Sequence, residues 1–561
     1  HSVTFKPSNA SFTPSIIREE DARSIIRKHN ITGGSTMVSF QGNGIAPSPQ
    51  YNAAQPLPVI IAGAGPSGLV AALTLQKYGV PFVIYEQNAS DKLCSDAGRG
   101  IDMSPSVIKI LEKELGLYRR LDAAMKQYEY IDVSNMDGKH INTLRFKEMS
   151  ERKRHITGER NFGFASRSKL QHILLEALGL IDRHGRIKDS PYGILRCGIA
   201  VTGYKKMIGN FVQVQLDNSM KVKGSALLAC DGVHSYIRQC MQEGSEGSAL
   251  NFTNQEAWWG TTTVRPGSAL EQELLHIAAS RKMQGYNVGL VVLGTNQNPG
   301  SFYANEVSKN VYSWSYFVES ESSNFDADLI RRGGKVLDET EKQELVDKIP
   351  STCKILKLFS EFTPTADMNR SAVFDRANNL PSVDGRVALL GDAAHYYHPL
   401  RGEGSNKAMV DGYVAAMRLA TAIMGKSSSS NSKSQKSPSI EWALLGFDSY
   451  KRRKGNTALV KKSRKYGQGA TSNSRYTCWA RQTYFKFMSA PKMIRELCTG
   501  DKSNSRFVSD MIKELKPYPK PARCIARPVI PGSGACDSIE MELSKTKTFT
   551  EEDVGCVCMG F

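Results

Sequence analysis

The sequence predicts an α/β fold with a Rossmann-like, nucleotide-binding parallel sheet, an interleaved antiparallel sheet and a helical C-terminal region. A glycine-rich turn follows a buried strand near residue 60, alternating aromatic segments cluster between about residues 250 and 380, and basic helical segments follow residue 440. Strand–turn–helix–strand order favours a parallel sheet, whereas alternating apolar and polar residues favour strands with one buried face.

The first element is the apolar run 58–62, which predicts a buried strand, and a glycine-rich turn follows it directly. A helix is expected over 69–78 and a second strand over 81–85, ending at Glu86. Glycines in such a unit allow close backbone approach to a pyrophosphate, and an acidic residue about 20 positions later can bind a ribose. The pattern predicts a dinucleotide site; the alternative is an ordinary βαβ turn. The turn consists of Gly63, Ala64, Gly65, Pro66, Ser67 and Gly68.

A second motif follows the apolar run 226–228 and contains Asp231, Gly232, Ser235 and Arg238. Asp-Gly after a strand is by itself an ordinary turn. A functional interpretation depends on its place between the first motif and a third one.

The third motif follows an apolar strand predicted at 387–390, so that Asp392 lies near the carboxyl end of that strand. It continues to a turn with Pro399, Gly402 and Gly404, which opens a helix expected over about 406–424. Backbone N–H groups at such a helix start can bind an anion or an electron-rich carbonyl.

Together the three motifs resemble those of the aromatic-hydroxylase-type flavoprotein monooxygenases, the family typified by p-hydroxybenzoate and salicylate hydroxylases. The resemblance covers about residues 58–425, and 440–470 more loosely. It implies a glutathione-reductase-type FAD-binding domain with a substrate-covering sheet at about 250–380. It also implies an enzyme that consumes NADPH or NADH and molecular oxygen. Such an enzyme inserts one oxygen atom, by hydroxylation or epoxidation, into an aromatic or other electron-rich small molecule through a flavin C4a-hydroperoxide.

The resemblance also assigns the cofactor contacts. Arg99 and Arg167 fall where relatives place guanidinium groups near the cofactor, and such groups bind pyrophosphate well; either could instead be a surface arginine paired with a carboxylate. His398 and Arg401, inside the flavin-facing turn, are weak catalytic candidates, and no metal site is predicted. The implied cofactor-binding residues are Gly63, Ala64, Gly65, Pro66, Ser67, Gly68, Glu86, Arg99, Gly100, Arg167, Asp231, Gly232, Asp392, Pro399, Gly402, Gly404, Ser405 and Asn406.

The net charge of +18 originates mainly between residues 447 and 527, where Lys and Arg outnumber Asp and Glu by 20 to 5. No zinc spacing or RNA-binding motif accompanies this charge, which argues against nucleic-acid binding. The simplest interpretation is a solvated helix face. Peripheral contact with a membrane or a partner is the alternative.

The rest of the chain contributes little chemistry. Residues 1–57 are expected to be disordered, 426–439 to be a low-complexity insertion, 440–530 to be a basic helical region and 531–561 to be a flexible tail. Eleven scattered cysteines favour a reducing compartment, and the longest apolar runs are too short for a membrane span. We therefore expect a cytoplasmic protein, with membrane association and organelle targeting left open. Cys558, fourth from the end, fits a prenylation box only poorly because Gly560 follows it.

Two other functions remain open. A same-fold reductase or oxidase acting on an isoprenoid or lipid-like substrate would use the same motifs. Halogenases of this fold carry a Trp-x-Trp-x-x-Pro signature, which the pair Trp258 and Trp259 does not match. A non-enzymatic flavin-binding scaffold is the third possibility. The sequence leaves open the substrate, the choice between NADPH and NADH, and the oligomeric state.

Overall fold

The structure is a computed structural model that describes residues 57–94, 100–147, 163–243, 245, 249–283, 288–320, 335–376, 380–424 and 438–497, with 508, 509, 513 and 515. The chain divides into residues 1–55 and 56–561, and everything described belongs to the second part. The predictions for 1–57, 426–437 and 531–561 therefore fall outside the described residues, apart from residue 57.

A six-stranded, largely parallel sheet forms the nucleotide-binding half, with the strand order β19-β20-β12-β1-β2-β8. Only the short edge strand β19 is antiparallel to its neighbour. Its central strand β1 pairs in parallel with β2 and β12, so the carboxyl ends of all three lie at one edge. The strands are β1 (Val59–Ala62), β2 (Phe82–Glu86), β8 (Leu195–Cys197), β12 (Ala226–Ala229), β19 (Val383–Asp384) and β20 (Val387–Leu389).

Both faces of this sheet are covered, as its continuous apolar strands require. Val59 and Ile61 face a core formed with the helices, whereas Ile60 and Ala62 face a core formed with a second sheet. The helical layer contains α2 (Pro66–Lys77), α7 (Arg167–Ala177), α13 (Glu403–Met424) and α14 (Ile440–Phe447). The opposite layer contains β9 (Val201–Met207), β10 (Phe211–Leu216), β11 (Lys221–Gly224) and α8 (Tyr236–Met241).

An eight-stranded sheet forms the second half, in the order β17-β18-β13-β16-β15-β14-β5-β6. All neighbours are antiparallel except β14 and β5. The strands are β5 (Tyr130–Asn135), β6 (His140–Arg145), β13 (Asn251–Thr263), β14 (Val288–Leu293), β15 (Ser301–Ser308), β16 (Val311–Glu319), β17 (Lys335–Val336) and β18 (Met368–Asp375).

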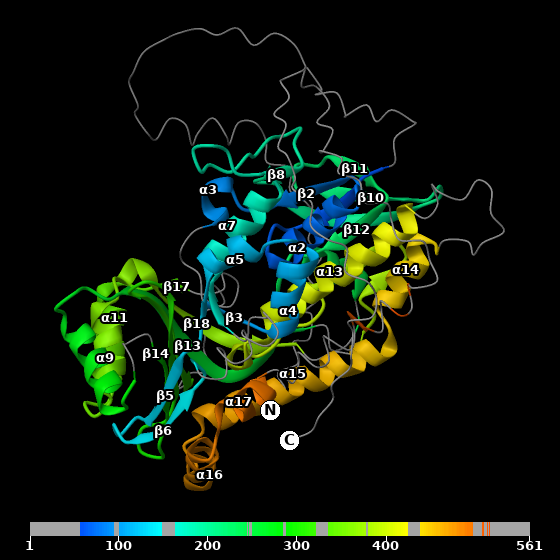
Figure 1. Cartoon of the computed structure of the whole chain (residues 1–561). Helices are drawn as coiled ribbons and strands as arrows, with labels where there is room; N and C mark the ends of the chain where they lie inside the picture. Colours follow the sequence, from blue (N-terminus) through cyan, green and yellow to red (C-terminus); the bar gives the residue numbers. More distant parts are fainter. Residues whose placement is uncertain are drawn as a thin grey trace, which may run out of the picture. The chain divides into compact units, whose positions relative to one another are not determined.

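Helices cover one face of the large sheet, and Figure 1 shows α9 and α11 on one side of it and α15 on the other. Trp258 and Tyr316 pack into the helix-covered core, whereas Trp259 and Phe317, next to them along the strands, face the opposite way. This alternation divides the aromatic residues between structural packing and an open face. The covering helices are α9 (Ala269–Ser280), α11 (Glu339–Lys348) and α12 (Lys354–Phe362), with the short helix η2 (Thr365–Asp367) following.

A small three-stranded sheet and several short helices connect the two halves. The sheet has the order β3-β7-β4, all antiparallel. Its strands are β3 (Gly100–Met103), β4 (Met125–Gln127) and β7 (Gly163–Ser166). The short helices are α3 (Ser90–Leu93), α4 (Pro105–Lys109), η1 (Ile110–Glu114) and α5 (Tyr118–Ala124), with η3 (Gly391–Ala393) and η4 (Pro399–Arg401) in the third motif.

The C-terminal region contains α15 (Tyr450–Thr471), α16 (Arg475–Lys486) and α17 (Ala490–Leu497). Residues 487–489 separate α16 from α17, and Pro491 lies in the first turn of α17, where a proline is tolerated. The charges of α15 are divided: Arg452 and Arg464 form ion pairs with Asp411 and Asp375, whereas its lysines 454, 461, 462 and 465 are exposed. None of the described helices combines the length and apolar character needed to cross a bilayer.

The predicted fold class is confirmed: an α/β nucleotide-binding domain, an interleaved sheet and a helical C-terminal region. Two details differ. The large sheet also takes β5 and β6 from residues 130–145, which lie well before the predicted range. Helix α13 begins at Glu403, earlier than the expected residue 406 and directly after Gly402, whose left-handed conformation (φ 61°) ends η4.

Candidate functional site

The glycine-rich turn after β1 uses each glycine differently. Gly63 has φ 100°, and a Cβ there would lie 2.4 Å from the carbonyl oxygen of Cys230. A Cβ on Gly68 would lie 2.0 Å from the carbonyl oxygen of Gly63. A Cβ on Gly65 would meet no atom within 4 Å. Gly63 and Gly68 are therefore required by packing, whereas Gly65 borders open space.

Glu86, at the end of β2, folds back onto the same turn. Its carboxylate accepts hydrogen bonds from the backbone N–H of Ala64 at 2.8 Å and from the N–H and Nδ2 of Asn88, both at 2.8 Å. Gln171 holds the other side of the turn, because its Nε2 donates to the carbonyl oxygen of Ala64 at 2.8 Å. Gln171 was not predicted; its position one helical turn after Arg167 was the available signal.

The second motif forms a capped turn after β12. Ser235 caps α8 by accepting a hydrogen bond from the N–H of Arg238 at 2.9 Å. Burial raises the pKa of Asp231, which also accepts the N–H of Ile237 at 3.4 Å. Ser235 and Arg238 thus shape the turn, and Gly232 (φ 78°) lets the backbone reverse beside Asp231.

Arg376, which was not predicted, connects the second and third motifs. Its side chain is almost fully buried and donates to the carbonyl oxygens of Val233 at 2.9 Å and Asp392 at 3.3 Å. Burial, together with the nearby charge of Arg238, lowers the pKa of Arg376 to about 10. Its position at the end of β18 gives no motif, so the sequence offered no signal for it.

Asp411 of α13 holds the third motif in place through its side-chain carboxylate. Its carboxylate accepts the N–H of Gly391 at 3.1 Å and pairs with His395 at 2.9 Å and Arg452 at 2.7 Å. Burial alone would raise the pKa of Asp411, but Arg452 and His395 outweigh it and hold that pKa well below its usual value. His395 therefore serves as a structural partner of Asp411.

His398 is fully buried and is not among the residues that line the large cavity described below. Its Nδ1 accepts a hydrogen bond from the N–H of Leu400 at 3.3 Å, so Nε2 carries the proton and faces Oε1 of Gln255 at 2.6 Å. Burial, reinforced by Arg464, lowers the pKa of His398 to about 4. This neutral imidazole joins the third motif to β13 and α15, a structural role.

Arg401 is also buried, 3.7 Å from Glu403 and with its guanidinium 5.8 Å from the ring centre of Tyr466. Its side chain lies behind the turn, whereas the neighbouring Leu400 and Gly402 face the open side. The geometry favours a role in shaping the turn.

Asn406 connects the third motif to the end of β3, and its hydrogen bond with Ser104 spans 302 residues of sequence. Its Oδ1 accepts the N–H of Ser104 at 2.9 Å, and its Nδ2 donates to the carbonyl oxygens of Asp102 at 2.7 Å and Gly402 at 2.8 Å. The carboxylate of Asp102 consequently lies against Gly402, where a Cβ would be 2.4 Å from Oδ2.

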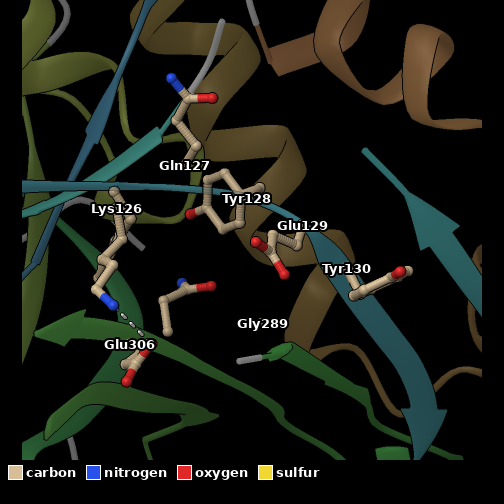
Figure 2. A pocket seen from close by; sticks show the side chains of 9 residues that line it. Lys126, Gln127, Tyr128, Glu129, Tyr130, Gly289 and Glu306 are labelled. Carbon is tan, nitrogen blue, oxygen red and sulfur yellow. Dashed lines mark ion pairs between the residues drawn. The ribbon is translucent and has the colours of Figure 1, made fainter. Parts of the chain in front are cut away.

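Asp102 and Tyr128 form a polar pair beside that turn. Tyr128 donates its hydroxyl proton to Oδ1 of Asp102 at 2.7 Å. Burial raises the pKa of Asp102 to about 6, and the hydrogen bond from Tyr128 opposes part of that rise. Figure 2 shows Tyr128 in the link between β4 and β5, near the Lys126–Glu306 ion pair of 3.4 Å. The hollow drawn there, about 10 Å³, holds a water molecule at most.

One cavity of about 1320 Å³ is lined by residues of all three motifs and by Asp102 and Tyr128. It begins at the glycine-rich turn, passes the second and third motifs, and ends beneath the large sheet at Trp259, Tyr303 and Phe317. Typical ligand pockets hold about 300–1000 Å³, so this cavity has room for a dinucleotide and a second molecule. The predicted residues that line it are Gly63, Gly65, Pro66, Ser67, Glu86, Gly100, Arg167, Asp231, Gly232, Asp392, Pro399, Gly402, Gly404 and Ser405.

Comparison with known proteins identifies the family. The family model described as an FAD binding domain matches residues 56–184 and 204–437. The chain belongs to the FAD-dependent, aromatic-hydroxylase-type monooxygenase family.

Named relatives agree with this assignment. The chain is 26% identical to a chloroplastic zeaxanthin epoxidase of Spinacia oleracea, over 65% of this chain and 47% of that protein. It therefore spans about half the length of that epoxidase. It is 23% identical to aurachin C monooxygenase/isomerase of Stigmatella aurantiaca, over 78% of this chain and 96% of that protein. Klebsiella pneumoniae HpxO, solved with FAD and uric acid, shares the fold with a TM-score of 0.58 and a sequence identity of 20%. The match covers 79% of this chain and 96% of that one.

The residues of this flavoprotein fit FAD. Gly65, at the start of α2, and Gly404, in the first turn of α13, both line the cavity. A Cβ on Gly65 would meet no atom within 4 Å, and one on Gly404 would make only an ordinary contact with Asp392 Oδ1 at 3.8 Å, so a ligand can approach the backbone at both helix starts. The first turn of α2 carries no acidic residue that would repel a pyrophosphate. Four other predicted residues do not line the cavity as described. Ala64 and Gly68 pack within the turn, and Asn406 connects β3 to α13 by hydrogen bonds. Arg99 lies outside the described residues.

Proposed function

We propose that this protein is an FAD-dependent, NAD(P)H-consuming monooxygenase that inserts one oxygen atom, by hydroxylation or epoxidation, into an aromatic or other electron-rich small molecule. The observation that carries the proposal is the single cavity that runs from the nucleotide turn to the aromatic face of the large sheet. FAD, when bound, would supply the oxygen-transfer chemistry that the sequence resemblance implies. The protein supplies binding, orientation and exclusion of water.

The nucleotide end is built to bind and position. The backbone around Gly65 and the start of α2 would hold the pyrophosphate, and Glu86 would contact the ribose while it also fixes the turn. At the other helix start, Gly404 and Ser405 in the first turn of α13 line the cavity, and a Cβ on Gly404 would lie 3.8 Å from Oδ1 of Asp392. Helix-start N–H groups stabilise negative charge, which suits the electron-rich edge of a flavin.

The substrate end is built to exclude water. Trp259 and Phe317 belong to one apolar cluster of the large sheet, with Leu400 packed against it, and all three line the cavity. Such a wall leaves little room for solvent around a reacting substrate. Tyr303 and Tyr466, which share a hydrogen bond, add polar groups that can orient a substrate hydroxyl or carbonyl.

Asp102 is the residue that we propose to hold or release a proton near the reaction. Its carboxyl lines the cavity, lies against Gly402 and has a pKa of about 6, raised by burial. A group that titrates near neutrality can accept a proton from a phenolic or enolic substrate. Tyr128 keeps that carboxyl oriented by its hydrogen bond to Oδ1.

NADPH or NADH is proposed as the reductant because the family resemblance implies it. The sequence carries only one dinucleotide fingerprint, at Gly63–Gly68. The nicotinamide cofactor would therefore share the open groove. The relatives named as an epoxidase and as a monooxygenase/isomerase support oxygen insertion, and either hydroxylation or epoxidation fits an aromatic-walled cavity.

Stopped-flow absorbance of the flavin-loaded protein tests the proposal. The protein would be reduced under anaerobic conditions with NADPH or NADH and then mixed with oxygen, with and without candidate phenols and polyenes. We expect flavin reduction by one of the two nucleotides and a transient band to the blue of oxidised flavin. Reoxidation without a transient under every substrate condition would favour a reductase or oxidase. Failure to bind FAD after reconstitution would refute the assignment altogether.

A further inference from the structure

Helix α16 and the residue after it present three large aromatic side chains to solvent. Tyr476 is 75% exposed, Trp479 63% and Phe487 72%. Tyr476 and Trp479 lie one helical turn apart with ring centres 6.1 Å from each other, and Phe487 continues along the helix two turns later. Side chains of this kind are normally mostly buried, so a row of them marks a contact surface.

The helix that carries them is firmly docked on its inner face. Arg481 donates to the carbonyl oxygens of Gly469 and Ala470, each at 2.6 Å. Asn142 of β6 donates to the carbonyl oxygens of Phe485 at 2.9 Å and Met488 at 2.8 Å, which caps the end of the helix. The exposure of the aromatic row is therefore a property of a fixed surface and not of an undocked helix.

Positive charge surrounds this aromatic row. Arg475, Lys486 and Lys492 are exposed, with Lys486 5.8 Å from the ring centre of Phe487 and Lys492 5.0 Å from that of Tyr484. Residues 449–495 contain no Asp or Glu, so no acidic side chain of α15, α16 or the start of α17 offsets these cations. The α16 surface is the set Arg475, Tyr476, Trp479, Lys486, Phe487 and Lys492.

We propose that the α16 surface docks the protein onto a lipid bilayer that carries anionic headgroups. Amphipathic aromatic side chains are stable at the headgroup level, and neighbouring Lys and Arg are attracted to anionic lipids. A second copy of the chain fits this surface less well, because a two-fold contact would bring its cations together. The proposal concerns docking alone and holds whichever oxidation the flavin site performs.

The docked surface would adjoin the substrate end of the cavity. Phe485 of α16 and Met493 of α17 line the cavity from the inner side of the same segment. Figure 1 shows α16 and α17 at the end of the C-terminal helices, beside β6 of the large sheet. A substrate dissolved in the bilayer would therefore reach the cavity without crossing the nucleotide half.

Co-sedimentation of the full-length, FAD-loaded protein with vesicles tests the proposal. Vesicles of phosphatidylcholine with about one-third phosphatidylserine would be compared with pure phosphatidylcholine at low and high salt. We expect binding to the anionic vesicles that salt weakens. The double variant Lys486→Gln/Lys492→Gln should partition roughly 25-fold less, since each cation near an anionic surface contributes about fivefold. The double variant Trp479→Ser/Phe487→Ser should lose roughly tenfold or more.

Trp442→Ser is the matched control, because Trp442 is 40% exposed on α14 and lies outside the α16 surface. It should leave vesicle binding unchanged, and all variants should keep their FAD content and circular dichroism spectrum. Absence of vesicle binding, or binding that the α16 variants do not weaken, would overturn the proposal. Sedimentation velocity decides the main alternative: a dimer that Trp479→Ser/Phe487→Ser dissociates, without vesicle binding, would make this surface an interface between copies.

Discussion

The two ends of the cavity are assembled in different ways. At the nucleotide end, Glu86 holds a turn only 22 residues earlier in the chain, and the turn itself is six consecutive residues. At the substrate end, Asn406 holds Ser104 across 302 residues, and the N–H of Gly100 donates to Ser313 across 213 residues. The first end depends on local backbone geometry, whereas the second depends on how distant elements pack.

This difference separates what the two ends can recognise. Backbone N–H groups and glycines bind a phosphate whatever else the molecule contains, so the nucleotide end can stay the same among enzymes with different substrates. The substrate end uses side chains such as Asp102, Tyr303 and Tyr466, which come from separate elements. Substitution in any of these elements changes the chemistry offered to the substrate without disturbing the nucleotide turn.

The sharpest test of the nucleotide end compares two glycines. Gly63→Ala would place a Cβ 2.4 Å from the carbonyl oxygen of Cys230 at φ 100°, so we expect the free energy of unfolding to fall by roughly 3–4 kcal/mol. Gly65→Ala would meet no atom within 4 Å and keeps an allowed backbone (φ −72°), so the apoprotein should stay within about 1 kcal/mol of wild type.

Gly65 should nevertheless be essential for FAD binding. A methyl group at Gly65 would enter the space that the pyrophosphate needs, and we expect FAD affinity to fall by roughly tenfold or more. Urea unfolding of the apoproteins and fluorescence titration with FAD measure the two effects separately. Equal FAD affinity in Gly65→Ala and wild type would show that the pyrophosphate does not approach this turn.

A second test asks whether His398, inside the third motif, belongs to the chemistry or to the scaffold. Its pKa is about 4 in the folded protein, below the ordinary value of 6.5, so between these values the unfolded chain binds a proton that the folded chain does not. Stability should therefore fall as pH drops from 6.5 to 4, by about 3 kcal/mol from this residue alone.

His398→Gln retains a donor toward Gln255 but does not titrate. The variant should be less stable than wild type at pH 7.5, and that difference should shrink by pH 4.5. Urea unfolding at a series of pH values measures this. A constant difference across the series would mean that His398 is already protonated or exposed in the folded protein, and would restore it as a catalytic candidate.

The same contrast explains what could be predicted from the sequence. The turn Gly63–Gly68, Glu86 and the Asp231 and Asp392 motifs were recognisable because local spacing determines how they fold, and all of these segments contribute to the cavity. Arg376 and Gln171 belong to none of the three motifs and act through hydrogen bonds to backbone carbonyl oxygens, and only the position of Gln171 one turn after Arg167 gave a local signal. The contribution of β5 and β6 to the large sheet depends on long-range strand pairing, which residue periodicity does not specify.

Asp102, the proposed proton site at the substrate end, gives the prediction with the smallest expected effect. Because its carboxylate is buried, its charge should lower the free energy of unfolding at neutral pH. Its folded pKa of about 6 lies above the ordinary value of 3.8, so between these values the folded protein retains a proton that the unfolded chain releases. Stability from this residue is thus present below pH 3.8 and is lost as pH rises through about 6.

Asp102→Asn removes the charge, and the apoprotein should gain on the order of 2 kcal/mol over wild type at pH 7.5 and little at pH 4. Tyr128→Phe is the matched control, because it removes the partner hydroxyl but keeps the carboxylate. Since that hydroxyl opposes the rise in the Asp102 pKa, its loss should strengthen the pH dependence, whereas Asp102→Asn should abolish it. A destabilised Asp102→Asn at pH 7.5 would mean that the carboxylate is well solvated, and the proton at the substrate end would then have to be held by another group.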